Sequence, residues 1–217
     1  MPLEVTELQS IGDEQRAKDY VRGAVGDQTF AVLERYVRLL LVENQKQNLI
    51  SKPSEASIWQ RHIADSVQLL RFVPRETDSD WLDLGSGPGL PGIVIAACRP
   101  REKFSLVESR KRRVEFLESC VEKLDLQNCT IKGCRLEAIE PLPVRVITAR
   151  AFAPMKKLLD LSAPFSTAET HYILPKGRSA SDELQSLKPK VRKMFHVEQS
   201  LTDPNAGIIV GSRSTAI

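Results

Sequence analysis

The chain has 217 residues, which is room for one full domain of ordinary size with an extension. Hydrophobic residues make up 41% and charged residues 27%, and this composition excludes a disordered or collagen-like chain. No apolar run approaches the roughly 20 residues of a membrane-spanning helix, and the first ten residues lack the pattern of a signal peptide. We therefore expect a cytoplasmic protein.

Cysteine and histidine usage gives poor support for a zinc site. The four cysteines form no Cys-x-x-Cys pair, and the three histidines are scattered along the chain. We expect reduced thiols and no bound metal. The net charge of +3 is compatible with a nucleic-acid partner but is also common among proteins that bind none, so the placement of the basic residues has to decide.

The first third of the chain has the hydrophobic period of helices. Apolar residues from Phe30 to Leu40 recur at helical spacing and predict an amphipathic helix over residues 29–47. A second helix is expected to follow, with Ser54 as its N-cap. We interpret residues 1–75 as a helical extension that precedes the main domain.

From residue 80 onward, strand-like and helix-like segments alternate, which is typical of a mostly parallel sheet with helices on both faces. The predicted strands are residues 81–84, 104–108, 130–132, 144–149 and 172–174. The predicted helices are residues 90–99, 110–124, 154–161 and 182–187. Residues 194–210 predict an antiparallel hairpin at the edge of the sheet, because two strand-like runs flank a turn-forming Asp-Pro-Asn-Ala-Gly segment. Residues 76–217 are thus expected to form one α/β domain.

A glycine-rich turn follows the first predicted strand. Gly85, Gly87, Gly89 and Gly92 come after Asp83 and lead into an apolar helix. Glycine lets the backbone take positive φ values and lets a ligand approach closer than a Cβ would permit. The segment predicts a loop that binds a nucleotide-type cofactor, and a glycine turn without a ligand is the plainer alternative.

The spacing of these glycines favours one cofactor over another. The last three match a dinucleotide-binding Gly-x-Gly-x-x-Gly, but in that fingerprint the first glycine follows the strand directly. Here the strand ends at Gly85, and the Asp-x-Gly-x-Gly-x-Gly spacing resembles motif I of class I (Rossmann-like) methyltransferases, which use S-adenosylmethionine. That resemblance implies that Asp83 helps to hold the turn and the cofactor amine. Glu108, at the end of the second strand, can accept the ribose hydroxyls of either cofactor.

Four basic residues stand at the predicted start of the helix that follows the second strand. Ser109 is expected as its N-cap, followed by Arg110, Lys111, Arg112 and Arg113. A helix N-terminus carries partial positive charge, so cations in its first turn are disfavoured by roughly 0.3–1 kcal/mol each. An array of RNA phosphates would offset this cost. The alternative is a solvated face that balances acidic residues further along the helix.

Five motifs resemble one known family in their order and spacing. They are Asn-Leu-Ile from Asn48, Arg-His-Ile-x-Asp-Ser from Arg61, the glycine loop with its Gly-Leu-Pro-Gly ending, Arg-Ala-Phe-Ala from Arg150 and Lys-Gly from Lys176. From about residue 30 to about residue 187, the chain resembles the bacterial small-subunit rRNA guanine-N7 methyltransferase G family, once called glucose-inhibited division protein B. Val144-Arg145 and Pro175 depart from the family pattern.

The glycine motif and the family resemblance together imply contacts with S-adenosylmethionine. The residues implied are Asp83, Gly85, Ser86, Gly87, Gly89, Leu90, Glu108, Leu136, Glu137 and Arg150. Leu136 would pack on the adenine face, and the backbone there or the Glu137 carboxylate would meet the exocyclic amine. An ordinary core position is the plainer interpretation of Leu136.

A second set of residues is implied to contact the RNA substrate. The set comprises Arg61, His62, Arg110, Lys111, Arg112 and Lys176. Arg150 is the expected catalytic residue, because its guanidinium follows the fourth strand and would orient the target base. A helix-packing or capping histidine is the plainer interpretation of His62.

The reaction that the resemblance implies is methylation of a guanine N7 in 16S rRNA, either free or within the small ribosomal subunit, by a monomeric enzyme. N7 carries an exposed lone pair, so the reaction needs positioning and electrostatic screening rather than a general base. The alternatives are a methyltransferase for another RNA base, a protein or a small molecule, an NAD-linked oxidoreductase, and an RNA-binding module without activity.

Overall fold

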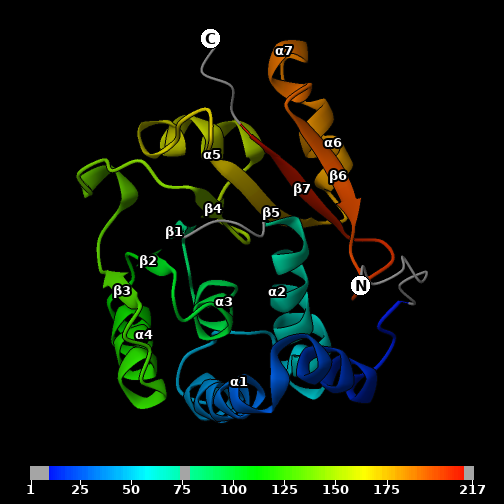
Figure 1. Cartoon of the computed structure of the whole chain (residues 1–217), viewed down its shortest axis with the longest axis vertical. Coiled ribbons are helices and arrows are strands. Elements are labelled where there is room, and N and C mark those ends of the chain that lie inside the picture. The colour runs from blue at the N-terminus through cyan, green and yellow to red at the C-terminus, as the bar shows by residue number, and fades with distance from the viewer. Residues whose placement is uncertain (1–9, 74–78, 213–217) are drawn as a thin grey trace.

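The computed structural model describes residues 10–73 and 79–212. The expected boundary between residues 75 and 76 lies outside these ranges. Within them, one seven-stranded sheet runs in the order β3-β2-β1-β4-β5-β7-β6 (Figure 1). The first five strands of that order are parallel, while β7 is antiparallel to both β5 and β6. The predicted α/β class, with its C-terminal antiparallel hairpin at the sheet edge, is confirmed.

Each predicted strand is present, with shifted ends. The strands are β1 (Asp80–Leu84), β2 (Lys103–Val107), β3 (Cys129–Lys132), β4 (Val146–Thr148), β5 (His171–Gly177), β6 (Phe195–Gln199) and β7 (Gly207–Ser212). β5 extends beyond its prediction and includes Pro175. Proline is tolerated there because β4 pairs with β5 only as far as Ile173, so no neighbour on that side requires the missing N–H.

Helices cover both faces of the sheet. In Figure 1, α1, α2 and α3 lie below the sheet, and α5 and α6 lie above it. The helices are α1 (Glu14–Asn44), α2 (Asp65–Val67), α3 (Gly92–Cys98), α4 (Lys111–Leu124), α5 (Met155–Ser162), α6 (Ala180–Gln185) and α7 (Pro189–Arg192). The shorter turns are η1 (Lys52–Ser57), η2 (Trp59–Ala64), η3 (Gln68–Phe72), η4 (Leu136–Ala138) and η5 (Ala163–Phe165).

Successive side chains of β1 point to opposite faces of the sheet, so they belong to two separate hydrophobic clusters. Trp81 stacks on Phe104 with ring centroids 5.2 Å apart and belongs to the hydrophobic cluster of α1, α3 and α4. Leu82 and Leu84 point the other way, into the cluster of α5 and α6. Asp83 shares the face of Trp81, so its carboxyl is buried beneath α3 rather than exposed at the surface.

The N-terminal helix starts earlier than predicted. α1 begins at Glu14, with the Asp13 carboxylate accepting a hydrogen bond from the Arg16 N–H at 2.8 Å. Gly26 interrupts it with a φ of 77°, and the predicted amphipathic part follows that kink. This part packs against η2, α3 and α4, and the Tyr36 hydroxyl donates to the Pro88 carbonyl of the glycine loop at 2.8 Å.

The second predicted helix is irregular, and its predicted cap is wrong. Residues 52–72 pass through the 3₁₀ turn η1, the π-helix η2, one turn of α2 and the 3₁₀ turn η3. Ser51 is the N-cap residue, and Ser54 lies inside η1, where its hydroxyl donates to the Ser51 carbonyl at 2.8 Å. The apolar residues that predicted this segment, such as Ile58 and Ile63, are buried.

The prediction of Ser109 as a helix cap is also wrong. Arg110 occupies the N-cap position of α4 and its side chain makes no capping hydrogen bond. The Glu108 carboxylate instead accepts a hydrogen bond from the Arg110 N–H at 2.8 Å. An acid at this point also opposes the partial positive charge of the helix N-terminus.

Among the described helices, none combines the length and the apolar character needed to cross a lipid bilayer.

Replacement of glycine by alanine should have opposite effects on the free energy of unfolding at Gly92 and at Gly23. In Gly92→Ala, the new Cβ would lie 2.6 Å from Asp83 Oδ2 and 2.8 Å from Leu106 Cγ, so overpacking should lower the free energy of unfolding by about 1–3 kcal/mol. Gly23 is exposed within α1 with no atom near its Cβ position, and Gly23→Ala should raise the free energy of unfolding by about 0.5–1 kcal/mol. Urea denaturation measures both. Equal effects of the two substitutions would contradict the close packing at Gly92.

Candidate active site

The glycine loop connects β1 to α3 at the carboxyl edge of the parallel strands. Gly85, Gly87 and Gly89 have φ values of 65°, 57° and 97°, which other residues rarely adopt. Hydrogen bonds hold the turn, with the Ser86 N–H bound to the Val107 carbonyl at 2.9 Å and the Gly89 N–H bound to the Ser86 carbonyl at 2.8 Å. Leu90 is buried at the end of the loop. The predicted backbone geometry of the loop is therefore confirmed.

Asp83 lies beneath this loop and supports it from below. Its Oδ1 accepts a hydrogen bond from the Thr148 hydroxyl at 2.9 Å, which joins β1 to β4. Its Oδ2 has no hydrogen-bond partner among the described residues. Burial raises the pKa of the carboxyl to about 6 from its ordinary value of 3.8. Oδ2 lies beneath α3, next to Gly92, so the carboxyl supports the turn from the protein interior.

Glu108 follows β2 and borders the loop. Its buried carboxylate accepts a hydrogen bond from the Gly87 N–H at 3.1 Å and lies 3.6 Å from the Arg113 guanidinium. A carboxylate oxygen has two lone pairs, so these contacts leave acceptor capacity for ribose hydroxyls. The predicted ribose contact stays a prediction.

Leu136 and Glu137 form the start of η4, which follows β3. Leu136 is buried in the cluster that includes Leu84, Val107 and Ala149, all near the carboxyl ends of their strands. Glu137 is exposed. Leu136 therefore has core contacts in any case, and its contact with an adenine stays a prediction.

A cavity of about 620 Å³ lies at the carboxyl edge of β4 and β5, and none of the loop residues 85–92 lines it. Four of the predicted substrate or catalytic residues line it, namely Arg61, His62, Arg150 and Lys176. They come from η2, from the segment after β4 and from β5, so residues far apart in sequence meet here. Phe152 lies between the cavity and the loop, because a Cβ built on Gly85 would be 2.6 Å from its ring.

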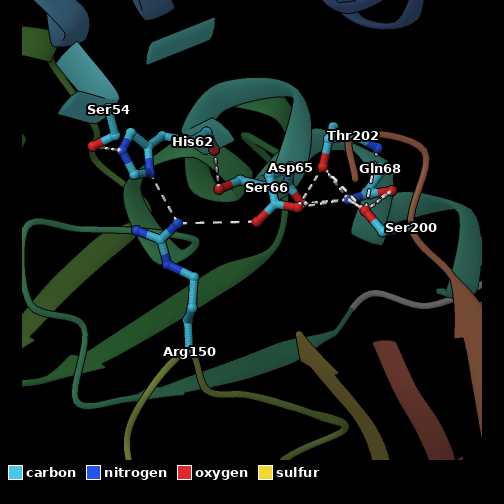
Figure 2. Close-up of polar contacts among 8 residues, drawn as sticks. All are labelled: Ser54, His62, Asp65, Ser66, Gln68, Arg150, Ser200 and Thr202. Carbon is cyan, nitrogen blue, oxygen red and sulfur yellow. Dashed lines mark hydrogen bonds and ion pairs between the residues drawn. The ribbon is translucent and has the colours of Figure 1, made fainter. Parts of the chain in front are cut away.

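Arg150 is held by two side chains of the N-terminal helical segment (Figure 2). Its Nη1 donates a hydrogen bond to His62 Nδ1 at 3.1 Å and lies 3.9 Å from Asp65 Oδ2. His62 and Asp65 are three residues apart, which places both on the same face of their helical segment. The helical segment and the sheet therefore share one polar contact at the cavity wall.

The contacts of His62 determine its tautomer. An arginine can only donate, so Nδ1 accepts, and Nε2 must carry the hydrogen and donate to the Ser54 hydroxyl at 2.9 Å. Burial, with the positive charges of Arg150 and Arg61, lowers the pKa of His62 to about 3. The imidazole is neutral and both ring nitrogens are engaged, so His62 positions Arg150 and is not a general base.

Asp65 connects Arg150 to the hairpin. Its Oδ1 accepts hydrogen bonds from Gln68 Nε2 and from the Thr202 hydroxyl, each at 2.8 Å, and Gln68 also binds Ser200 (Figure 2). Burial raises the pKa of the Asp65 carboxyl, and the Arg150 charge partly offsets this effect. The loop between β6 and β7, which lines the cavity, is thereby joined to the helical segment.

The Lys176 side chain, predicted to contact RNA, is held by contacts within the protein. Its side chain is buried, and Nζ donates to the Ala153 carbonyl at 2.7 Å and pairs with Glu183 at 2.9 Å. These contacts hold the Arg-Ala-Phe-Ala segment against β5. A role in shaping the cavity fits them directly, whereas contact with RNA stays a prediction.

Arg110, Lys111 and Arg112 lie at the start of α4, on the β2 side of the glycine loop, and are not among the residues that line the cavity. Arg112 donates to the Lys46 carbonyl at 3.0 Å, just after α1, so part of the basic charge meets acceptors within the protein. Lys111 has 91% of its side chain exposed and lies 3.9 Å from Glu115. The contacts of these three residues with RNA stay predictions. For Lys111, Glu115 is an acidic residue further along the helix that balances its charge, as the alternative interpretation expected.

Sequence reasoning missed the roles of Asp65, Phe152 and Thr202. Asp65 stands in the Arg-His-Ile-x-Asp-Ser motif three residues after His62, and this helical spacing was the available signal. Phe152 likewise stands beside Arg150 in a motif. Thr202 could not be found from a local pattern, because its partner Asp65 is 137 residues away.

No group of three or more potential metal-binding side chains is present within the described residues.

The fold and the loop define the class of protein. A SAM dependent methyltransferase from Aquifex aeolicus superposes with a TM-score of 0.55 and 14% identity, over 74% of this chain and 94% of that one. A MtNAS mutant in complex with S-adenosylmethionine superposes with a TM-score of 0.54 and 17% identity, over 92% of this chain and 84% of that one. At these identities the likeness shows the fold alone, which is that of the class I methyltransferases.

The chain belongs to the rRNA small subunit methyltransferase G family, whose family model matches residues 29–207. The ribosomal RNA small subunit methyltransferase G of Erythrobacter litoralis is 52% identical over 93% of this chain and 97% of its own length. That of Sphingopyxis alaskensis is 46% identical over 96% of this chain and 90% of its own length. The resemblance derived from the motifs is confirmed.

The depressed pKa of His62 predicts a pH-dependent stability. Between about pH 6 and pH 4 the unfolded chain binds a proton at this histidine that the folded chain excludes, so the free energy of unfolding falls as the pH falls. His62→Gln keeps an acceptor for Arg150 and a donor for Ser54 but cannot titrate. Its unfolding free energy should therefore fall less steeply, by about 1.4 kcal/mol per pH unit. Identical slopes in urea titrations across this range would contradict a neutral His62.

Proposed function

We propose that this chain transfers the methyl group of S-adenosylmethionine to N7 of guanine 527 in the 16S rRNA of the small ribosomal subunit. The observation that carries the proposal is the cavity at the carboxyl edge of β4 and β5, lined by the Arg-His and Arg-Ala motifs of the family. A class I fold alone would support a methyltransferase of any substrate.

The residues of the loop fit S-adenosylmethionine. Glycines with positive φ leave the loop without Cβ atoms at its turns, and the Glu108 carboxylate follows β2 where a ribose would lie. When bound, the cofactor supplies an electrophilic methyl group.

Arg150 is the residue best placed to orient the base. It lies at the carboxyl edge of β4, next to β1 and the glycine loop, and lines the cavity. Its hydrogen bond to His62 and its ion pair with Asp65 fix the guanidinium before a substrate arrives. Preorganised donors of this kind contribute to catalysis through proximity and electrostatics.

Methylation of N7 needs no proton acceptor. The lone pair of N7 forms the new bond to the methyl carbon while the bond from carbon to sulfur breaks, so no proton has to leave the base. Both nitrogens of His62 are engaged, which agrees with a mechanism without a general base. The base gains positive charge, and the carboxylates of Asp65 and Glu183 at the cavity wall offset it.

The first test is methyl transfer from labelled S-adenosylmethionine to small ribosomal subunits from cells that lack this protein. The label should map to one guanine N7 of 16S rRNA. Label on ribosomal protein, on another base, or nowhere despite cofactor binding would contradict the proposed function. The last result would favour a protein or small-molecule acceptor, or an inactive RNA-binding module.

Arg150→Ala should lower kcat by about 10²- to 10³-fold, because it removes a donor positioned at the reacting base. Arg150→Lys should recover little, since an ammonium lacks the planar set of donors that contacts His62 and Asp65 together. Arg101→Ala is the matched control, because this exposed arginine precedes β2 at the opposite edge of the sheet. Equal kcat values for Arg150→Ala and the control would contradict the assigned role.

A further inference from the structure

Asp65 presents its two carboxylate oxygens to different surroundings (Figure 2). Oδ1 faces Gln68 and Thr202 and accepts a hydrogen bond from each. Oδ2 faces Arg150, and this ion pair at 3.9 Å is too long for a hydrogen bond. The side chain is one-fifth exposed and lines the cavity, so Oδ2 keeps lone pairs for an additional donor.

The other carboxylates that line the cavity are occupied differently. Glu183 accepts from Ser179 through Oε1, and through Oε2 it accepts from the Met155 N–H and pairs with Lys176. Asp203 accepts from the Asn205 N–H within its own turn. Asp65 alone of the three combines a fixed oxygen with an open one beside Arg150.

Arg150 and Asp65 thus place a hydrogen-bond donor and an acceptor side by side. Guanine presents the complementary pair, since its O6 accepts and the adjacent N1–H donates. Adenine presents the reverse pair, a 6-amino donor beside an N1 acceptor, although it also has an N7. A carboxylate facing an N1 acceptor would leave two acceptors opposed without a proton between them.

We propose that Asp65 is a specificity-determining residue, which accepts a hydrogen bond from N1–H of the target guanine through Oδ2 while Arg150 donates to O6. The proposal rests on the proposed function and adds how this site selects its base. Gln68 and Thr202 hold the carboxylate in this orientation through Oδ1, so the acceptor is positioned before the base enters.

The same contacts dictate what Asp65→Asn would do. Gln68 and Thr202 donate hydrogen bonds to Oδ1, so the amide oxygen of the asparagine keeps that place and its NH₂ group takes the place of Oδ2. The variant would therefore face the base with a donor where the native protein has an acceptor. Its volume and its contacts to the hairpin are retained, which favours normal folding.

The experiment compares methyl transfer to small subunits reconstituted with either guanosine or 2-aminopurine riboside at the target position. Both bases have N7, but 2-aminopurine lacks O6 and has an N1 acceptor in place of N1–H. The native protein should prefer guanosine by about 10- to 100-fold in kcat/KM, and Asp65→Asn should reduce this preference by at least tenfold. Glu183→Gln is the matched control, and it should keep the native preference even if its overall rate falls.

The proposal is overturned if Asp65→Asn slows both substrates by the same factor, which would leave Asp65 with only a role in positioning Arg150. It is also overturned if the native protein methylates both substrates equally. Failure of the proposed function gives a different result, because the native protein would then transfer no methyl group to the guanosine subunits.

Discussion

The arrangement of the cavity depends on the Arg150 guanidinium, which joins the sheet to the N-terminal helical segment. Arg150 extends from the carboxyl edge of β4 and contacts His62 and Asp65, whose helix is held against the sheet by a shared hydrophobic cluster. The hydrophobic cluster brings the helical segment to the cavity, and the contacts of Arg150 fix the orientation of His62 and Asp65 there. Asp65 also accepts hydrogen bonds from Gln68 and Thr202. The network around Arg150 therefore connects the segment after β4, the N-terminal helical segment and the C-terminal hairpin.

The charges at this contact explain why the site positions its substrate and does not exchange protons with it. A histidine that accepts a hydrogen bond from an arginine must be neutral at that nitrogen, and burial favours the neutral form further. The charged side chains that line the cavity are equal in number, since the cations Arg61, Arg150 and Lys176 are matched by the carboxylates Asp65, Glu183 and Asp203. A base that becomes cationic on methylation therefore enters a cavity without excess positive charge, and Asp65 and Glu183 stabilise the charge that it gains.

The fold followed from local patterns more completely than the site did. Alternating strand and helix periods predicted every strand of the sheet, because burial on both faces leaves a strong apolar signal. The first half of α1 was missed, since it buries little more than Ala17 and Val21. The predicted cap Ser54 was wrong because its hydroxyl binds the Ser51 carbonyl and His62, eight residues further on. The predicted cap Ser109 was wrong because the Glu108 carboxylate accepts the hydrogen bond from the Arg110 N–H. The role of Thr202 depends on a contact across 137 residues, which no local pattern encodes.

The most direct test of this account is a structure of the protein with S-adenosylhomocysteine bound to the small ribosomal subunit. We expect a guanine inside the cavity, with its O6 edge toward Arg150 and Asp65 and its N7 toward the cofactor at the glycine loop. A guanine bound outside the cavity, for example against the basic start of α4, would contradict the assignment of this cavity as the substrate site.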